Sequence, residues 1–118
     1  MNSEGIKTCL LEAQRSLGEG GSRWLKNQAA DASGRMCLSQ AIFSSARRLE
    51  GTLNGERSLS YRAHQALLPA MFDRKDWLAV RHASQFNDPE VLTMIFNDDR
   101  STTWEDVDFV LRSTITRL

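Results

Sequence analysis

Apolar residues recur at helical spacing along almost the whole chain, and this pattern rules out most fold classes. Ile6, Leu10, Ala13 and Leu17 lie at i, i+4, i+7 and i+11, which places them on one face of a helix. No run of β-branched residues alternates with polar residues for more than a few positions, so no strand is expected. For 118 residues the pattern predicts an all-α fold, with a single domain over 1–118 built as a compact bundle of about six or seven short helices.

Glycines and small polar residues delimit the first three helices. Gly18 is expected to end the first helix. A short second helix is expected to carry Trp24 and Leu25 and to end near Ala30. The third helix is predicted over 38–49, where small and apolar residues form one continuous face.

Prolines and acids mark the later helices. A fourth helix is expected from about Leu59, and Pro69 should kink or end it near Leu68, because proline removes a backbone donor. Asp76 is placed to cap a fifth helix. Asp88, followed by proline and glutamate, is a strong start signal for the sixth helix, with Asp88 as its cap.

The most polar segment is FNDDRSTTWEDV, at 96–107, just before the last helix. Its oxygen-bearing side chains would suit calcium or magnesium, but the spacing does not match a calcium loop, which needs a glycine at the sixth position. Thr102 and Glu105 instead have the spacing of a capping box, and Thr103 and Asp106 are further cap candidates. We therefore expect helix caps and no metal in this segment.

The net charge of zero hides an uneven distribution of charge. Residues 88–108 hold seven acids and one base, a net charge of −6, while the rest of the chain holds eight acids and fourteen bases, a net charge of +6. Two outcomes are open: the two sets neutralise each other within the fold, or the surface has two oppositely charged faces.

The residues that usually carry chemistry do not form a recognisable motif. Cys9, Cys37, His64 and His82 lack the close pairing of zinc ligands. Neither a phosphate-binding loop nor a Gly-x-Ser-x-Gly motif is present, although a serine–histidine site assembled only in space stays open. We expect no cofactor. Both cysteines lie in apolar helical patterns, which favours a reduced, cytoplasmic protein, and neither a signal segment nor a membrane span is expected.

The middle of the chain is basic, which would suit a regulator that binds nucleic acid. Nucleic-acid-binding proteins usually carry a clear positive excess, however, and this chain has none overall. Solvated helix faces are therefore the simpler interpretation of the residues concerned, which are Arg47, Arg48, Arg57, Arg62, Arg74, Lys75 and Arg81.

Two aromatic residues are expected to lie off the apolar faces of their helices. Phe109 falls about 100° or more from the main apolar face of the last helix, and Phe43 is similarly displaced in the third. Either both helices bury two sides, or the rings are exposed for a partner. Together with Trp104, Asp98 and Asp99, the two rings are the candidate partner contacts, and a homodimer through an aromatic face stays open.

Several blocks of the sequence together resemble a known family. They are Trp24, the stretch from Asp31 through Gly34 and Cys37-Leu38 to Ala41-Ile42, Phe96-Asn97-Asp98, and Thr103-Trp-Glu105-Asp106-Val107. This combination resembles a domain of unknown function found in small proteins of actinobacteria and their phages. The resemblance covers 24–42 and 96–111 and implies a phage or actinobacterial cytoplasmic context. It implies no activity, ligand or catalytic residue.

From these features we expect a non-enzymatic protein-interaction or regulatory protein, in a phage context one that binds a host protein. The acidic segment would attract a basic protein partner, and Trp104 or Phe109 would anchor it. The first alternative is a nucleic-acid-binding regulator that uses the basic middle helices. The second is a small hydrolase or metal-dependent enzyme.

Overall fold

Five α-helices and one short 3-10 turn dominate the described part of the chain. The structure is a computed structural model that describes residues 3–50, 58–79 and 88–118. Residues 76–79 are also helical, and no strand occurs in these ranges, where two isolated bridges involve Met36. The all-α prediction is therefore confirmed. The elements are α1 (Ser3–Ser16), η1 (Glu19–Gly21), α2 (Leu38–Glu50), α3 (Leu59–Arg74), α5 (Pro89–Asp98) and α6 (Trp104–Arg117).

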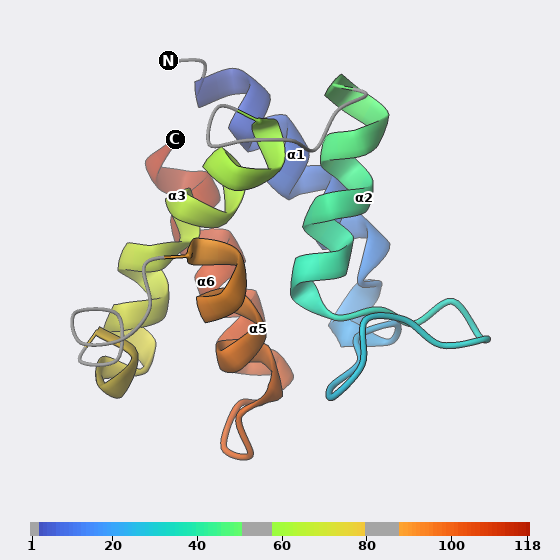
Figure 1. Ribbon diagram of the computed structural model, residues 1–118, viewed down its shortest axis with the longest axis vertical. Coiled ribbons are helices and arrows are strands. Elements are labelled where there is room, and N and C mark those ends of the chain that lie inside the picture. Colours follow the sequence, from blue (N-terminus) through green and yellow to red (C-terminus); the bar gives the residue numbers. More distant parts are fainter. Residues whose placement is uncertain (1–2, 51–57, 80–87) are drawn as a thin grey trace.

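The helices pack around each other as a bundle (Figure 1). α1 contacts α2, α3 and α6, while α5 packs against α3 and α2. In the view of Figure 1, α2 and α5 lie toward the reader, and the loop that joins η1 to α2 extends beyond the start of α2. The radius of gyration is 13.0 Å, as expected for one compact body of this length.

Two predictions about helices are wrong: the short helix expected to carry Trp24 and Leu25, and the end of the helix that contains Pro69. The segment after η1 is a loop, because the backbones of Trp24 and Ala30 pair with Met36, and Asn27 has a φ of 69°, which a helix cannot contain. α3 does not end near Leu68 but continues through Pro69 to Arg74. Proline deprives only the carbonyl four residues earlier of its partner, and Gln65, which carries that carbonyl, is exposed.

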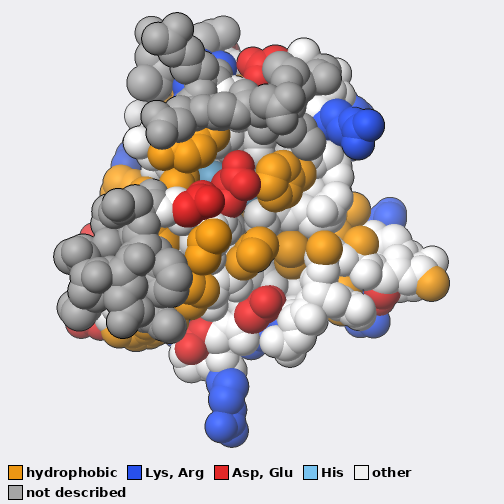
Figure 2. Space-filling model, viewed as in Figure 1, with side chains coloured by type: hydrophobic (Ala, Val, Ile, Leu, Met, Phe, Trp, Pro, Cys, Tyr) orange, Lys and Arg blue, Asp and Glu red, His pale blue; other side chains and the backbone are white. Residues whose placement is uncertain are grey.

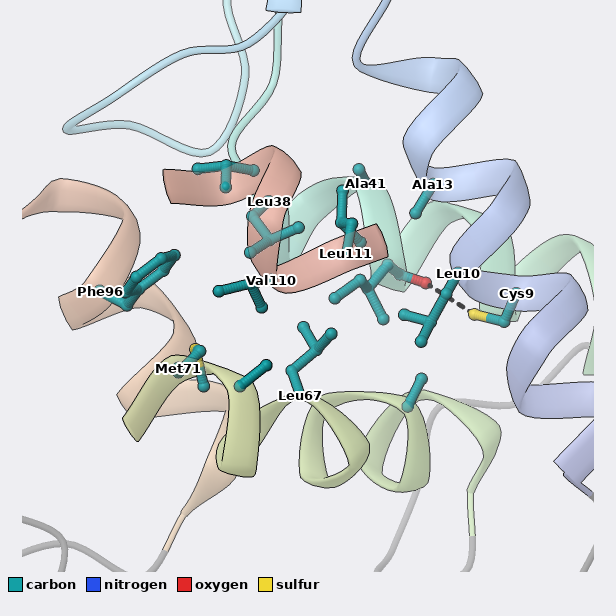
Figure 3. Close-up of a cluster of buried hydrophobic side chains, with 14 of the residues drawn as sticks. Cys9, Leu10, Ala13, Leu38, Ala41, Leu67, Met71, Phe96, Val110 and Leu111 are labelled. Carbon is teal, nitrogen blue, oxygen red and sulfur yellow. Dashed lines mark hydrogen bonds between the residues drawn. The ribbon is translucent and has the colours of Figure 1, made fainter. Parts of the chain in front are cut away.

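A single cluster of buried apolar residues unites all five α-helices (Figure 3). Leu10 from α1, Leu38 from α2, Leu67 from α3, Phe96 from α5 and Leu111 from α6 are each fully buried. Their helical spacing therefore translates directly into packing, since each helix turns its apolar face inward.

Candidate functional site

Asn97 joins the loop after η1 to the end of α5. Its Oδ1 atom accepts the indole N–H of Trp24 at 2.6 Å and the backbone N–H of Leu38 at 3.1 Å. Its Nδ2 group donates to the carbonyl of Leu25 at 3.0 Å and to the carboxylate of Asp98 at 2.9 Å. Asn97 is fully buried, and both ends of its amide are occupied by the protein itself.

Neighbouring contacts extend this junction. Asp98 accepts the backbone N–H of Asn27 at 2.8 Å, and Lys26 Nζ donates to the carbonyl of Thr102 at 2.7 Å. The rings of Trp24 and Trp104 lie 6.1 Å apart in a tilted arrangement. The two sequence blocks that carry the family resemblance, 24–42 and 96–111, therefore contact each other. The contacts described above join one block to the other and so stabilise the fold.

The cap of α6 lies one residue later than expected. Thr103 is the N-cap, and the Asp106 carboxylate accepts its backbone N–H at 2.8 Å. The predicted pair of Thr102 and Glu105 does not form the box. Arg74 donates to the same Asp106 carboxylate at 2.6 Å, which helps to keep this carboxylate beside Thr103. Glu105 is instead exposed in the first turn of α6. The Thr102 hydroxyl is buried and has no hydrogen-bond partner among the described residues.

α5 begins as its start signal indicates. Asp88 is the N-cap, and its carboxylate accepts the backbone N–H of Glu90 at 2.9 Å. Pro89 follows in the first turn, where no intrahelical donor is needed.

Acids near α6 are paired with bases. Asp106 contacts both Arg74 and Lys75, and Asp108 forms an ion pair with Arg112 at 3.0 Å. Partial burial raises the pKa of Asp106, but the Thr103 N–H and the two cations outweigh it, so the pKa is lowered overall. Asp106 and Asp108 are therefore neutralised within the fold, whereas the exposed Glu105 forms no ion pair with a described residue.

Acids of α5 lack such partners. Asp88, Glu90 and Asp98 form no ion pair with any residue in the described ranges. Asp99 accepts hydrogen bonds from the hydroxyl and N–H of Ser101, and this bonding lowers its pKa. Within the acidic segment, Asp106 and Asp108 are therefore neutralised, whereas Asp88, Glu90 and Asp98 have no base paired with them in the described ranges.

Trp104 lines a groove between α1, η1 and α6. The groove has a volume of about 490 Å³. Leu11 lines it too and is 39% exposed, although it lies on a helix whose other apolar residues are buried. Its remaining lining residues are Gln14, Arg15, Gly18, Glu19, Gly20 and Asp108.

The other predicted partner contacts lie elsewhere. Phe109 is half-buried against the core, and the Arg74 guanidinium lies 4.9 Å from the centre of its ring. Phe43 is half-buried on α2, with its ring 5.2 Å from that of His64. The structure therefore does not gather Trp104, Phe109 and Phe43 into one aromatic surface.

A serine–histidine pair, Ser39 and His64, lies beneath Phe43. His64 Nδ1 donates to the Ser60 carbonyl at 2.7 Å, since a carbonyl can only accept, and Nε2 therefore accepts from the Ser39 hydroxyl at 2.8 Å. Burial lowers the pKa of His64 to about 4. The exposed fractions are 1% for Ser39 and 0% for His64, so a substrate cannot reach the hydroxyl and the pair gives no support to a hydrolase.

Both cysteines are free and buried. The Cys9 thiol donates weakly to the carbonyl of Ile42 at 3.7 Å (Figure 3). Burial raises its pKa to about 12, and burial also raises the pKa of Cys37. Both thiols are therefore protonated at neutral pH and lack the character of a nucleophile.

Basic residues of the middle helices are largely paired with acids. Arg48 contacts Glu12, and Arg62 contacts Glu50, each at 3.5 Å, while Arg74 and Lys75 hold Asp106. Arg57, Arg81 and His82 lie outside the described ranges. This pairing leaves less free positive charge for nucleic acid than the sequence suggested.

Neither a metal cluster nor a membrane span occurs in the described ranges. Within them, no group of three or more histidine, cysteine, aspartate or glutamate residues is arranged to hold an ion. No helix there has the length and apolar character to cross a membrane.

Comparisons with known proteins found no matching family model, no matching curated protein and no matching solved structure.

Proposed function

We propose that this protein is a non-enzymatic interaction protein that binds a partner protein in the groove between α1, η1 and α6. Trp104 and Leu11 carry this proposal, because tryptophan is enriched among interface hot spots and the exposed Leu11 lines the same groove. Leu11 contributes apolar area that the fold itself leaves uncovered.

Trp104 is held in place before any partner arrives. It packs against Trp24, and a Cβ atom at Gly21 would collide with its ring, so backbone and indole are in close contact. Asn97 fixes Trp24 in turn. A side chain ordered in advance loses little rotamer entropy on binding, which favours affinity.

The charges near the groove select the partner. Glu19 lines it and the exposed Glu105 follows Trp104, while Arg15 is the basic side chain of the lining. Asp108 lines it too, but it is paired with Arg112. Acids thus outnumber bases here, which fits a segment that presents an apolar or aromatic side chain flanked by lysine or arginine.

A random-peptide library displayed on a carrier and selected against the immobilised protein tests this proposal. We expect enriched peptides that combine basic residues with an apolar anchor. Leu11→Asp should weaken the binding of such a peptide by at least about tenfold, because it places a polar carboxylate in the apolar centre of the contact.

Leu49→Asp is the matched control. Leu49 is 45% exposed and lies on α2, outside the residues that line the groove, so this variant should retain full peptide binding. The proposal fails if no basic sequence is enriched, or if Leu11→Asp and Leu49→Asp bind the selected peptide equally well.

A further inference from the structure

The face formed by α2 and α5 exposes apolar and charged side chains together. Met94 is 44% exposed on α5, and Val91 is half-buried one turn before it. Glu90 and Asp98 lie four residues before and after Met94, on the same side of the helix. Figure 2 shows hydrophobic side chains gathered across this face, with acidic side chains among them and basic ones at its edges.

Phe43 connects the α5 part of this face to α2. Its ring lies 5.2 Å from that of His64, and the Asp88 carboxylate acts electrostatically on the same imidazole. Phe43 and Asp88 therefore lie near the same buried ring. Phe43 also lines a pocket of about 270 Å³ together with Gln40, Ser44 and Arg47.

Unpaired charges of opposite sign thus flank Phe43. Asp88 and Glu90 lie toward α5, and Arg47 lies toward the end of α2. None of the three forms an ion pair with a residue in the described ranges. Burial and the adjacent Asp88 raise the pKa of Glu90, as expected for two acids close together that no cation of the described residues offsets.

We infer that a second copy of this chain docks on the α2–α5 face to form a two-fold dimer. Arg47 of each copy would meet Asp88 and Glu90 of the other copy, around an apolar centre that includes Phe43 and Met94. A two-fold interface uses the same patch on both subunits, so a patch that holds both signs of charge beside an apolar residue is complementary to itself.

A second copy fits this face better than an unrelated partner of one charge. A purely basic partner would satisfy Asp88 and Glu90 but would repel Arg47, and an acidic partner would do the reverse. A copy of the same chain satisfies both signs in one contact. The interface does not involve the Trp104 groove, so it leaves that groove free for the proposed partner.

Analytical ultracentrifugation of the full chain over a range of concentrations tests this inference. We expect a reversible monomer–dimer equilibrium that shifts toward the monomer as salt is raised, because screening weakens exposed ion pairs. Glu90→Lys and Arg47→Glu should each raise the dimer dissociation constant by at least about tenfold, since each places like charges opposite one another.

A charge swap gives the sharpest result. In a mixture of the Glu90→Lys and Arg47→Glu chains, the lysine of one copy faces the glutamate of the other, so a heterodimer should form more tightly than either variant pairs with itself. Its affinity should stay below that of the wild type, because the unchanged Asp88 beside the new lysine faces the same glutamate. Arg15→Glu is the control: Arg15 lines the Trp104 groove, so this reversal should leave dimerisation unchanged.

Three results would overturn the inference. They are a monomer at every concentration in low salt, a dimer that survives both charge reversals, and a mixture of the two variants that stays monomeric. Peptide selection on the groove is a separate measurement, so failure of the dimer leaves the proposed function standing, and the reverse also holds.

Discussion

The indole N–H of Trp24 donates to Oδ1 of Asn97 over 2.6 Å, across 73 positions of sequence. This bond brings together two blocks of residues that lie far apart in the sequence. One block supplies the loop after η1, the other supplies the end of α5, and a buried amide fastens them together. The groove at Trp104 is built on this junction, so its shape depends on a contact outside the groove.

Replacing the buried amide should destabilise the fold. Asn97→Ala leaves the Trp24 indole N–H and the Leu25 carbonyl without their partner, at a cost of about 3 kcal/mol in the free energy of unfolding measured by urea titration. Asn27→Gly is the control, because Asn27 is exposed, has a φ of 69°, and uses only its backbone N–H toward Asp98. Equal stability of the two variants would show that the junction is not needed.

Two adjacent threonines should respond differently to loss of the hydroxyl. Thr103→Val removes the N-cap hydroxyl of α6 and should cost about 1 kcal/mol of unfolding free energy. Thr102→Val removes a buried hydroxyl that has no partner in the described structure, so it should be neutral or slightly stabilising in the same titration. If Thr102→Val is the more destabilising of the two variants, the capping box is formed by Thr102 and Glu105 instead.

Two glycines of the turn after α1 form a second matched pair. A Cβ atom at Gly20 would meet nothing within 4 Å, so Gly20→Ala should cost only about 1 kcal/mol for its positive φ of 63°. Gly21→Ala adds a collision with the Trp104 ring to a similar backbone cost and should lose more than about 2 kcal/mol. Thermal unfolding of both variants measures the difference. Equal losses of stability would mean that the Trp104 ring can move aside without cost.

Buried His64 should make stability depend on pH. Its pKa is about 4 in the folded protein against an ordinary value of 6.5, so between these values the unfolded chain binds the proton more readily. The free energy of unfolding should therefore be at its full value above pH 6.5. It should fall by roughly 3 kcal/mol as the pH drops to 4.

Urea unfolding at several pH values measures this effect. In His64→Gln the loss between pH 6.5 and 4 should be much smaller, because glutamine does not titrate. An unchanged slope in this variant would assign the acid sensitivity to other groups.

Both thiols should be shielded in the native protein. Cys9 and Cys37 are buried and their pKa values are raised, so a thiol reagent at mildly alkaline pH should react slowly with the folded chain. In denaturant both should react at once. The variants Cys9→Ala and Cys37→Ala show which thiol accounts for each phase of the reaction. Immediate reaction of the native protein would show that at least one of the two thiols is accessible to the reagent.

The helices themselves could be predicted from the sequence because their causes are local. Apolar spacing placed α1, α2, α5 and α6, and the Asp88-Pro89 pair marked the start of α5. The wrongly predicted helix after η1 shows where such local signals mislead. The apolar pair Trp24 and Leu25 resembles a helix face, and the backbone pairing with Met36 that overrides it comes from a later segment.

Only the tertiary structure decided what the side chains between the helices do. Glu105 and Asp106 are neighbouring acids, yet Asp106 binds Arg74 and Glu105 faces solvent, because α3 lies against only one side of α6. Ser39 hydrogen-bonds His64, and Phe43 and Asp88 both lie near the His64 ring. The packing of α2, α3 and α5 brings these residues together. Helix formation depends on neighbours three or four positions away, so the sequence determined it alone, whereas pairing across helices depends on which faces meet in space.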